Sequence, residues 1–237
     1  MFITGTNTDV GKSIITGFIA RYFLLNHHSI ITQKWIQTGS NEFSPDIQLH
    51  WKIMGQSKHD YTKYLKDICP YHFKLPASAH LAAQEENIKI NIDIIKKSYL
   101  KLKSDFKQVL VEGSGGIMMP IDNKITTLDL IKELNIPVLI VFSNELGAIN
   151  HTLLTVEQCK KNNIKIIGII ANQTQPNQKN DLILKDNPKI IEHHSGMKIL
   201  GSVPYLSNLE TEIDDKPWYL ELSNRLDQIY NNTHVEL

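Results

Sequence analysis

The sequence predicts a doubly wound α/β fold with a mostly parallel sheet, in a single domain that spans residues 1–237. Short apolar runs alternate with helical patterns along the chain, which is typical of this fold class. The runs at residues 109–111 and 137–142 are continuously apolar, as expected of strands that helices cover on both faces. A chain of 237 residues can bury a large core in one such domain.

A candidate phosphate-binding loop follows the first expected strand, residues 1–3. Residues 4–13 read Thr-Gly-Thr-Asn-Thr-Asp-Val-Gly-Lys-Ser, and a helical pattern then runs to about residue 26. Backbone N–H groups of such a loop can surround an anion, Lys12 can reach the phosphates of a nucleotide, and Ser13 can coordinate Mg²⁺. We therefore expect a fold of the P-loop NTPase type, although five residues rather than the usual four separate the two glycines. The alternative is a plain strand-to-helix turn.

The second expected strand, residues 30–33, ends at Lys34 and leads into a polar loop, residues 35–40. A lysine at the carboxyl end of a parallel strand faces the ligand crevice, or is simply solvated. Ser44 and Pro45 then mark the start of a helix, with Asp46 in its first turn. Asp46 is either a metal ligand or a helix cap.

A long segment, residues 55–80, is predicted to be irregular, with prolines at positions 70 and 76. Connections of this length often act as lids or substrate loops. Apolar residues then recur at helical spacing and predict a helix over residues 91–103.

The run at residues 108–116 predicts a buried strand that ends in Glu112 and a glycine-rich turn. Glycines there let the backbone approach a ligand closely. Glu112 should lie at the carboxyl edge of the sheet beside the phosphate loop, where a metal-binding acid is expected. The alternative is a glutamate that caps a turn.

The second half of the chain continues the alternation and ends a strand at Asn172, which either reads a base edge or is an ordinary turn residue. Helices are expected at residues 127–134, from a start within 143–151 to about 162, and at 219–230. Asp129, in the first of these helices, is expected to be exposed. Strands are expected at residues 137–142, 166–171 and 199–204.

Composition argues against several classes of protein. Lys plus Arg equals Asp plus Glu, at 25 each, so no broad nucleic-acid or membrane surface is expected. Cys69 and Cys159 are far apart and form no metal-binding pair, which together with the lack of a signal-like or membrane-spanning segment predicts a reduced, cytoplasmic protein.

Taken together, these motifs resemble the dethiobiotin synthetase family. The similarity extends from residue 1 to about 205, and the carrying motifs lie at residues 5–13, 34–39, 76–80, 111–116, 146–155, 171–172 and 201–204. The five-residue gap in the phosphate loop is itself typical of this family. One departure is Trp35, which stands where the family usually has proline.

The resemblance implies a homodimeric enzyme that uses ATP and Mg²⁺ to close a cyclic urea from 7,8-diaminononanoate and CO₂, through a carbamate and its mixed anhydride with phosphate. Lys12, Lys34 and Thr8 would be catalytic, and Ser13, Asp46 and Glu112 would hold Mg²⁺. The implied nucleotide-binding residues are Asn7, Thr8, Asp9, Val10, Gly11, Lys12, Ser13, Ile14, Asn172 and Pro204. The implied substrate-binding residues are Lys34, Thr38, Ser78, Gly115, Gly147, Ala148, Ile149 and Asn150, the last four acting from the neighbouring subunit.

Two other functions share the phosphate loop. A cobyrinate-type ATP-dependent amidoligase usually carries an additional glutaminase domain, for which this chain has no room. A dimeric ATPase switch of the ParA or MinD kind has a second lysine and two glycines where this chain has Asn7, Thr8 and Asp9.

Overall fold

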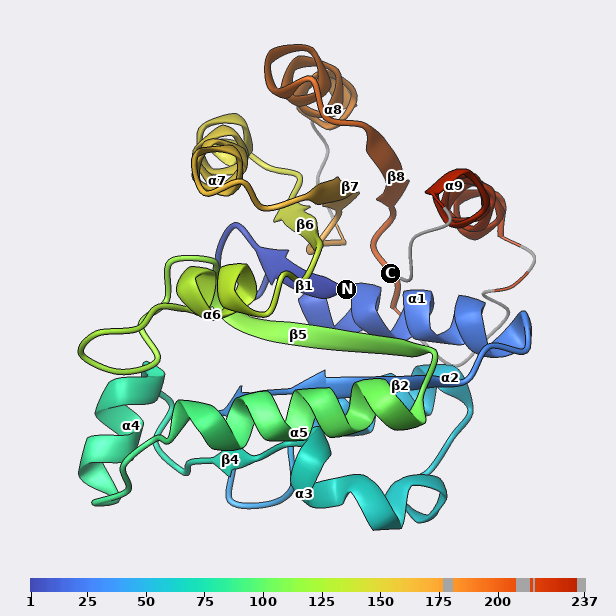
Figure 1. Cartoon of the computed structure of the whole chain (residues 1–237). Helices are drawn as coiled ribbons and strands as arrows, with labels where there is room; N and C mark the ends of the chain where they lie inside the picture. Colours follow the sequence, from blue (N-terminus) through green and yellow to red (C-terminus); the bar gives the residue numbers. More distant parts are fainter. Residues whose placement is uncertain (177–180, 208–213, 215, 234–237) are drawn as a thin grey trace.

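The computed structural model of the protein describes residues 1–176, 181–207, 214 and 216–233 and is centred on a six-stranded sheet (Figure 1). The strands lie in the order β2-β5-β1-β6-β7-β8, and neighbouring strands are parallel. This arrangement confirms the predicted doubly wound sheet. The strands are β1 (Phe2–Gly5), β2 (Ile30–Lys34), β5 (Gln108–Gly116), β6 (Val138–Ser143), β7 (Ile166–Asn172) and β8 (Ile199–Val203).

Helices cover both faces of the sheet (Figure 1). One face carries α1 (Lys12–Leu25), α2 (Pro45–Met54) and α9 (Pro217–Thr233). The other carries α5 (Ile92–Asp105), α6 (Thr127–Glu133) and α7 (Ala148–Lys161), with α8 (Asp181–Ser195) packed beside α7. Because both faces are covered, every residue of β6 is buried, which explains its continuous apolar run.

The segment between α2 and α5 is more regular than predicted. It contains a 3₁₀ helix, η1 (Lys58–Tyr64), then α3 (Leu65–Ile68), β4 (Tyr71–His72) and α4 (Ala79–Glu85). β4 pairs in parallel with β3 (Ile36–Gln37), part of the expected loop at residues 35–40. The predictions for these two segments are therefore wrong in part. Elements of two to seven residues are too short to show a hydrophobic period.

The glycine-rich end of β5 is strand and not turn, which corrects a second prediction. Gly116 still pairs with Gly5 of β1, and among the glycines of β5 Gly115 alone has a positive φ, of 70°. A Cβ at Gly113 would lie 2.8 Å from the ring of Phe2. These glycines therefore allow β5 to continue against β1 at the edge of the sheet where ligands bind.

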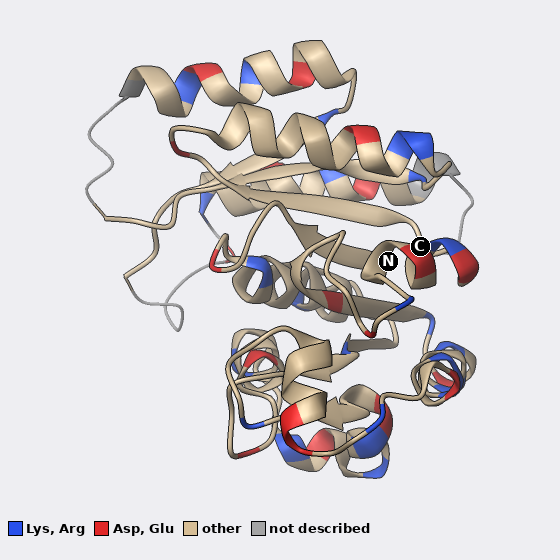
Figure 2. Ribbon diagram, turned by 90° about the vertical axis from the view of Figure 1, so that its left-hand side faces the viewer, with Lys and Arg blue, Asp and Glu red and all other residues tan. Residues whose placement is uncertain are grey.

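Charged residues lie mainly on the outer helices, where acidic and basic positions are interspersed (Figure 2). Among the described residues, no helix is long and apolar enough to cross a membrane. Asp129 is exposed, as predicted, and forms a capping box with Thr126 at the start of α6. Helix α8, which the sequence analysis did not identify, contains Pro188, which interrupts the usual helical signal.

Candidate active site

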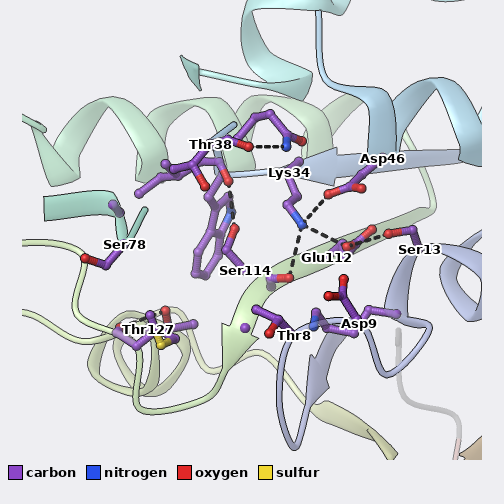
Figure 3. Close-up of a pocket in the computed structure, with 18 of the residues that line it drawn as sticks. Thr8, Asp9, Ser13, Lys34, Thr38, Asp46, Ser78, Glu112, Ser114 and Thr127 are labelled. Carbon is purple, nitrogen blue, oxygen red and sulfur yellow. Dashed lines mark hydrogen bonds and ion pairs between the residues drawn. The ribbon is translucent and has the colours of Figure 1, made fainter. Parts of the chain in front are cut away.

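A cavity of about 730 Å³ opens at the carboxyl ends of β1, β2 and β5. Side chains of Ser13, Lys34, Asp46 and Glu112 lie together in one part of it, and Thr38, Ser78 and Thr127 lie farther along (Figure 3). The sequence-predicted site residues that line it are Thr8, Asp9, Gly11, Lys12, Ser13, Ile14, Lys34, Thr38, Asp46, Ser78, Glu112 and Gly115. Residues from five separate segments of the chain thus meet at one edge of the sheet.

The phosphate loop ends at Gly11, the N-cap residue of α1, with a φ of 92°. No side chain caps this helix, so the N–H groups of its first turn can bind an anion. The Lys12 Nζ donates a hydrogen bond of 2.8 Å to the carbonyl of Asn7, across the loop. Burial and the nearby Lys34 ammonium lower the pKa of Lys12 to about 8, so the lysine is mostly charged at neutral pH. The loop therefore combines backbone donors with a buried positive charge.

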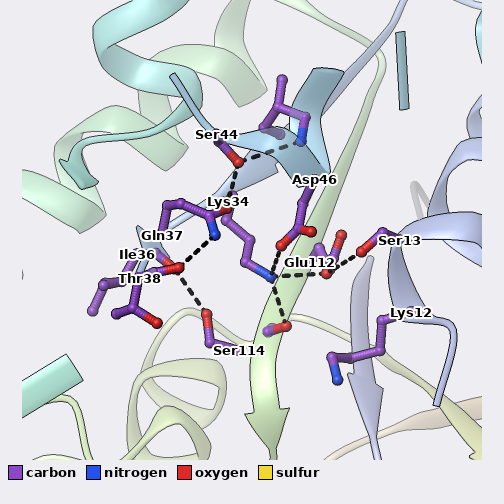
Figure 4. Close-up of polar contacts among 12 residues, drawn as sticks. Lys12, Ser13, Lys34, Ile36, Gln37, Thr38, Ser44, Asp46, Glu112 and Ser114 are labelled. Carbon is purple, nitrogen blue, oxygen red and sulfur yellow. Dashed lines mark hydrogen bonds and ion pairs between the residues drawn. The ribbon is translucent and has the colours of Figure 1, made fainter. Parts of the chain in front are cut away.

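A buried ionic cluster lies beside the loop (Figure 4). The Lys34 Nζ is 2.7 Å from the Asp46 Oδ2 and 2.8 Å from the Glu112 Oε1, and it also donates to the carbonyl of Gly113. Burial opposes the charge of Lys34, but the carboxylates of Glu112 and Asp46 outweigh it and raise its pKa. Burial likewise opposes ionisation of Glu112, but Lys34 and His50 lower its pKa to about 2. Lys34 and Glu112 are therefore both charged at neutral pH.

The three predicted metal ligands converge on this cluster. The Ser13 Oγ donates to the Glu112 Oε1 at 3.0 Å, and the Lys34 ammonium joins Glu112 to Asp46. Two carboxylates and a hydroxyl are hard oxygen donors, which fit Mg²⁺. The described residues hold no group of three or more His, Cys, Asp or Glu side chains that could bind a metal by themselves. A magnesium ion here would therefore share its ligands with nucleotide phosphates.

Two contributors to the site were missed from the sequence. His50 is fully buried and its Nε2 lies 2.7 Å from the Glu112 Oε2. Its only sequence signal is its position four residues after Asp46 on the same helix, which places both residues on one face.

The second contributor is the apolar part of the cavity wall. In the sequence, the residues that form it resemble ordinary core residues. The apolar side chains are Phe2, Trp35, Ile36, Leu49, Pro76, Met119, Pro120 and Ile121.

Trp35, the departure from the family pattern, is held rigidly in this wall. Its Nε1 donates to the Gln33 Oε1 at 3.0 Å, and its ring lies 4.9 Å from the ring of Phe2, centroid to centroid. Thr38 still lines the cavity. The tryptophan therefore packs into the end of β2 without removing Thr38 from the site.

Other predicted nucleotide-binding residues lie behind the phosphate loop. The Asn172 Nδ2 donates to the Val10 carbonyl at 3.0 Å, and both residues are buried. Pro204 follows β8, where Val203 is the register partner of Asn172. Asn7, at the tip of the loop, is exposed. Among the described residues, the lining of the cavity includes none of these four.

The segment at residues 147–150 also lies outside the described lining of this cavity. Gly147 is the N-cap residue of α7, with a φ of 91° and no side-chain cap. The preceding Leu146 is 88% exposed. A ligand at this helix start would therefore approach it from outside the cavity described above.

Gly11→Ala should weaken nucleotide binding and destabilise the fold. An added Cβ would lie 2.0 Å from the Asn172 Nδ2, and a positive φ costs a residue other than glycine about 1–3 kcal/mol. Gly196→Ala is the matched control, because Gly196 also has a positive φ but its added Cβ would meet nothing within 4 Å. Thermal unfolding and titration with an ATP analogue measure both effects. If Gly11→Ala and Gly196→Ala had the same thermal stability and the same affinity for the ATP analogue, the tight packing of Asn172 against the loop would be contradicted.

Comparison with known proteins is consistent with this site. Residues 1–212 match a family model described as an AAA domain. The ATP-dependent dethiobiotin synthetase BioD 2 of Haemophilus influenzae is 41% identical over 81% of this chain and 98% of its own length. The ATP-dependent dethiobiotin synthetase BioD of Clostridium perfringens (strain ATCC 13124) is 33% identical over 89% of this chain and 92% of its own length.

Solved structures share the fold at much lower identity. The MinD cell division protein of Aquifex aeolicus superposes with a TM-score of 0.60 at 14% identity, covering 98% of this chain and 97% of its own. The pNOB8 ParA bound to nonspecific DNA superposes with a TM-score of 0.59 at 12% identity, over 98% and 99% of the two chains. These likenesses confirm the P-loop NTPase type of fold alone. The sequence relatives show that the chain belongs to the family of ATP-dependent dethiobiotin synthetases, which are ligases.

Proposed function

We propose that residues 1–237 form one enzyme domain that closes the cyclic urea of dethiobiotin from 7,8-diaminononanoate and CO₂, with ATP as the phosphoryl donor. The observation that carries the proposal is the convergence of the phosphate loop with the Lys34–Asp46–Glu112 cluster in one cavity. The apolar wall of the same cavity suits the aliphatic chain of the diamine.

The reaction proceeds in three steps. One amine adds to CO₂ and loses a proton, which forms a carbamate. A carbamate oxygen then attacks the γ-phosphorus of ATP, and ADP leaves. The second amine attacks the carbamate carbon of this mixed anhydride and loses a proton, so that a second C–N bond forms as the C–O bond to phosphate breaks and phosphate departs. Such chemistry depends on positioning and on charge neutralisation and needs no covalent nucleophile from the protein.

Different residues of the cavity serve different parts of this reaction. Lys12 and Lys34 neutralise negative charge on the γ-phosphate and the carbamate, and Thr8 and Thr38 donate hydrogen bonds to the same groups. Ser78 and Gly115 line the path of the diamine. The Asn172 amide contacts the adenine, together with Pro204, which follows the neighbouring strand β8.

Ser13, Asp46 and Glu112 would hold Mg²⁺. When bound, the ion supplies charge neutralisation for the phosphates during transfer. The Lys34 ammonium pairs with both Asp46 and Glu112 and offsets one of their two negative charges. The two free thiols, Cys69 and Cys159, suit a reducing compartment, and we place the enzyme in the cytoplasm.

Phosphate release from ATP tests the proposed function. We expect release to require both the diamine and bicarbonate, and the product mass to equal that of the cyclic urea. Release that is independent of the diamine would instead favour an ATPase switch like those of the structural neighbours. Within the phosphate loop, Asn7, Thr8 and Asp9 stand where such a switch has a second lysine followed by two glycines.

We further propose a two-fold homodimer in which residues 147–150 bind the carboxylate of the diamine held by the other subunit. An uncapped helix start with Gly147 at its N-cap can bind an anion through backbone N–H groups. Leu146 and Leu154 are 88% and 58% exposed, so the same surface presents apolar side chains to a partner. In a monomer these residues stay outside the described lining of the cavity.

Mixing two inactive variants should restore part of the activity if the sites are composite. One variant is Lys12→Gln and the other is Gly147→Trp, because an added Cβ at Gly147 would meet nothing within 4 Å inside the protomer. A heterodimer then holds one site with both defects and one with neither. Gly147→Ala is the control for backbone strain, because it places a residue other than glycine at the same positive φ but adds only a small side chain. Absence of recovery after confirmed subunit exchange, or a fully active monomer, would refute the shared site.

A further inference from the structure

We propose that His50 is a positioning residue for Glu112, whose carboxylate it holds so that one oxygen stays turned toward Ser13 and the metal-binding side of the cavity. The inference rests on the proposed Mg²⁺ role of Glu112. It assigns a function to a residue of α2 that does not line the cavity itself.

The contacts of Glu112 divide between its two oxygens. The Oε1 accepts from the Ser13 Oγ at 3.0 Å and lies 2.8 Å from the Lys34 Nζ. The Oε2 lies 2.7 Å from the His50 Nε2, on the buried side of the carboxylate. Because His50 is 0% exposed and Glu112 is 2% exposed, water cannot substitute for this contact. The ring therefore fixes the rotation of the carboxylate from behind.

The contacts of Glu112 indicate which group donates in its contact with His50. The Glu112 Oε1 accepts from the Ser13 Oγ and the Lys34 Nζ, as a carboxylate does, and the Oε2 of the same carboxylate is the acceptor that faces the His50 Nε2. The His50 Nε2 must then carry the hydrogen and donate it. Among the described residues, the Nδ1 of the same ring has no hydrogen-bond partner.

Packing alone does not account for a histidine at this buried position, because one of its ring nitrogens has no hydrogen-bond partner among the described residues. An unpaired buried polar atom costs about 1–3 kcal/mol, whereas an apolar side chain of similar size avoids that cost. The hydrogen bond to Glu112 is the polar contact that the structure gives this ring. Its place in the fold is therefore explained by what it does to the carboxylate.

Helix α2 links His50 to the other carboxylate of the cluster. Asp46 lies in its first turn and His50 one turn later, so both project from one face. The helix start is fixed by Ser44, whose Oγ accepts from the Ile47 N–H and donates to the Gln37 Oε1 at 2.6 Å. One helix thus supplies Asp46 directly and orients Glu112 through His50.

The test compares a variant that loses the ring but keeps a hydrogen-bond donor with a variant that loses both. His50→Gln keeps a side-chain N–H that can reach Glu112, while His50→Met removes the donor and keeps an apolar side chain. For each variant, calorimetry gives the affinity for a non-hydrolysable ATP analogue with Mn²⁺ and with EDTA. The ratio of the two affinities isolates the contribution of the metal. We expect this ratio to fall about 10–100-fold in His50→Met and to stay near the parent value in His50→Gln, with the EDTA affinity unchanged in both.

A parent-like ratio in His50→Met would overturn the proposal, and so would an equal fall in both variants. If His50→Met does not fold, His50→Phe, which keeps a ring without the donor, takes its place. Glu112→Gln separates this inference from the proposed function. A parent-like ratio in Glu112→Gln would refute the metal role itself. A fall in Glu112→Gln without one in His50→Met would refute only the role of His50.

Discussion

Lys12→Gln should lower turnover by on the order of 10²–10³-fold while the protein stays folded. The lysine follows Gly11 at the start of α1, where the lysine of a phosphate loop reaches the β- and γ-phosphates of a nucleotide. Its pKa of about 8 leaves it mostly charged at neutral pH before nucleotide binds. Glutamine keeps much of the length and a hydrogen-bond donor but carries no charge.

The fold should tolerate this change because, within the described part of the chain, the ammonium hydrogen-bonds to the Asn7 carbonyl and forms no ion pair. Steady-state phosphate release with saturating diamine measures turnover, and circular dichroism with thermal unfolding checks the fold. Lys97→Gln, at an exposed position of α5, is the matched control and should match the parent. Near-normal turnover in folded Lys12→Gln would show that the loop takes no part in phosphoryl transfer.

Glu112→Gln should have the second-largest effect, lowering turnover by at least about 10²-fold at a fixed Mg²⁺ concentration. The amide removes one anionic ligand from the metal site and leaves Lys34 paired with Asp46 alone. Breaking a buried ion pair also destabilises the fold, here by up to about 3 kcal/mol, because Lys34 keeps one of its two partners. Raising the Mg²⁺ concentration should recover part of the turnover.

The pH dependence of stability gives an independent check on Glu112. The pKa of Glu112 is lowered from 4.5 to about 2 in the folded protein, so its charged form stabilises the fold above about pH 4.5. The parent should lose this stability as the pH falls from 4.5 toward 2, and Glu112→Gln should not.

Urea unfolding across this pH range, with Glu133→Gln as the control, measures the difference. Glu133 is a half-exposed partner of Lys96 on the surface, so its loss should cost less than about 1 kcal/mol. A Mg²⁺ requirement of Glu112→Gln that matches the parent would mean that Glu112 does not bind the metal. A matching pH profile of stability would mean that the charge of Glu112 does not stabilise the fold.

The charged residues of the site were predictable because parallel sheets bring distant strand ends to one edge. Lys34 and Glu112 end apolar runs, so both were expected at the ligand crevice before the structure placed them in one cluster. Asp46 follows a helix-start signal that fits a cap equally well, and its metal role was implied by the family resemblance. The α/β alternation followed from long apolar runs of the same kind.

Other parts of the site depend on tertiary packing that leaves no local signal. His50 looks like any polar residue of an amphipathic helix until Glu112 is found against its ring. Trp35 looks like a core aromatic until it is found in the cavity wall. The pairing of β3 with β4 joins segments of two residues each, whose periodicity cannot be measured.

The fate of the bicarbonate oxygen tests the proposed reaction most directly. The parent enzyme is given the diamine, ATP, Mg²⁺ and ¹⁸O-labelled bicarbonate in ordinary water, and the phosphate released in the first turnovers is analysed by mass. Attack of the carbamate oxygen on the γ-phosphate predicts one labelled oxygen in each phosphate formed from labelled carbamate. Unlabelled phosphate, released at the same rate with or without the diamine, would mean that water attacks ATP and that this cavity makes no carbamic-phosphoric anhydride.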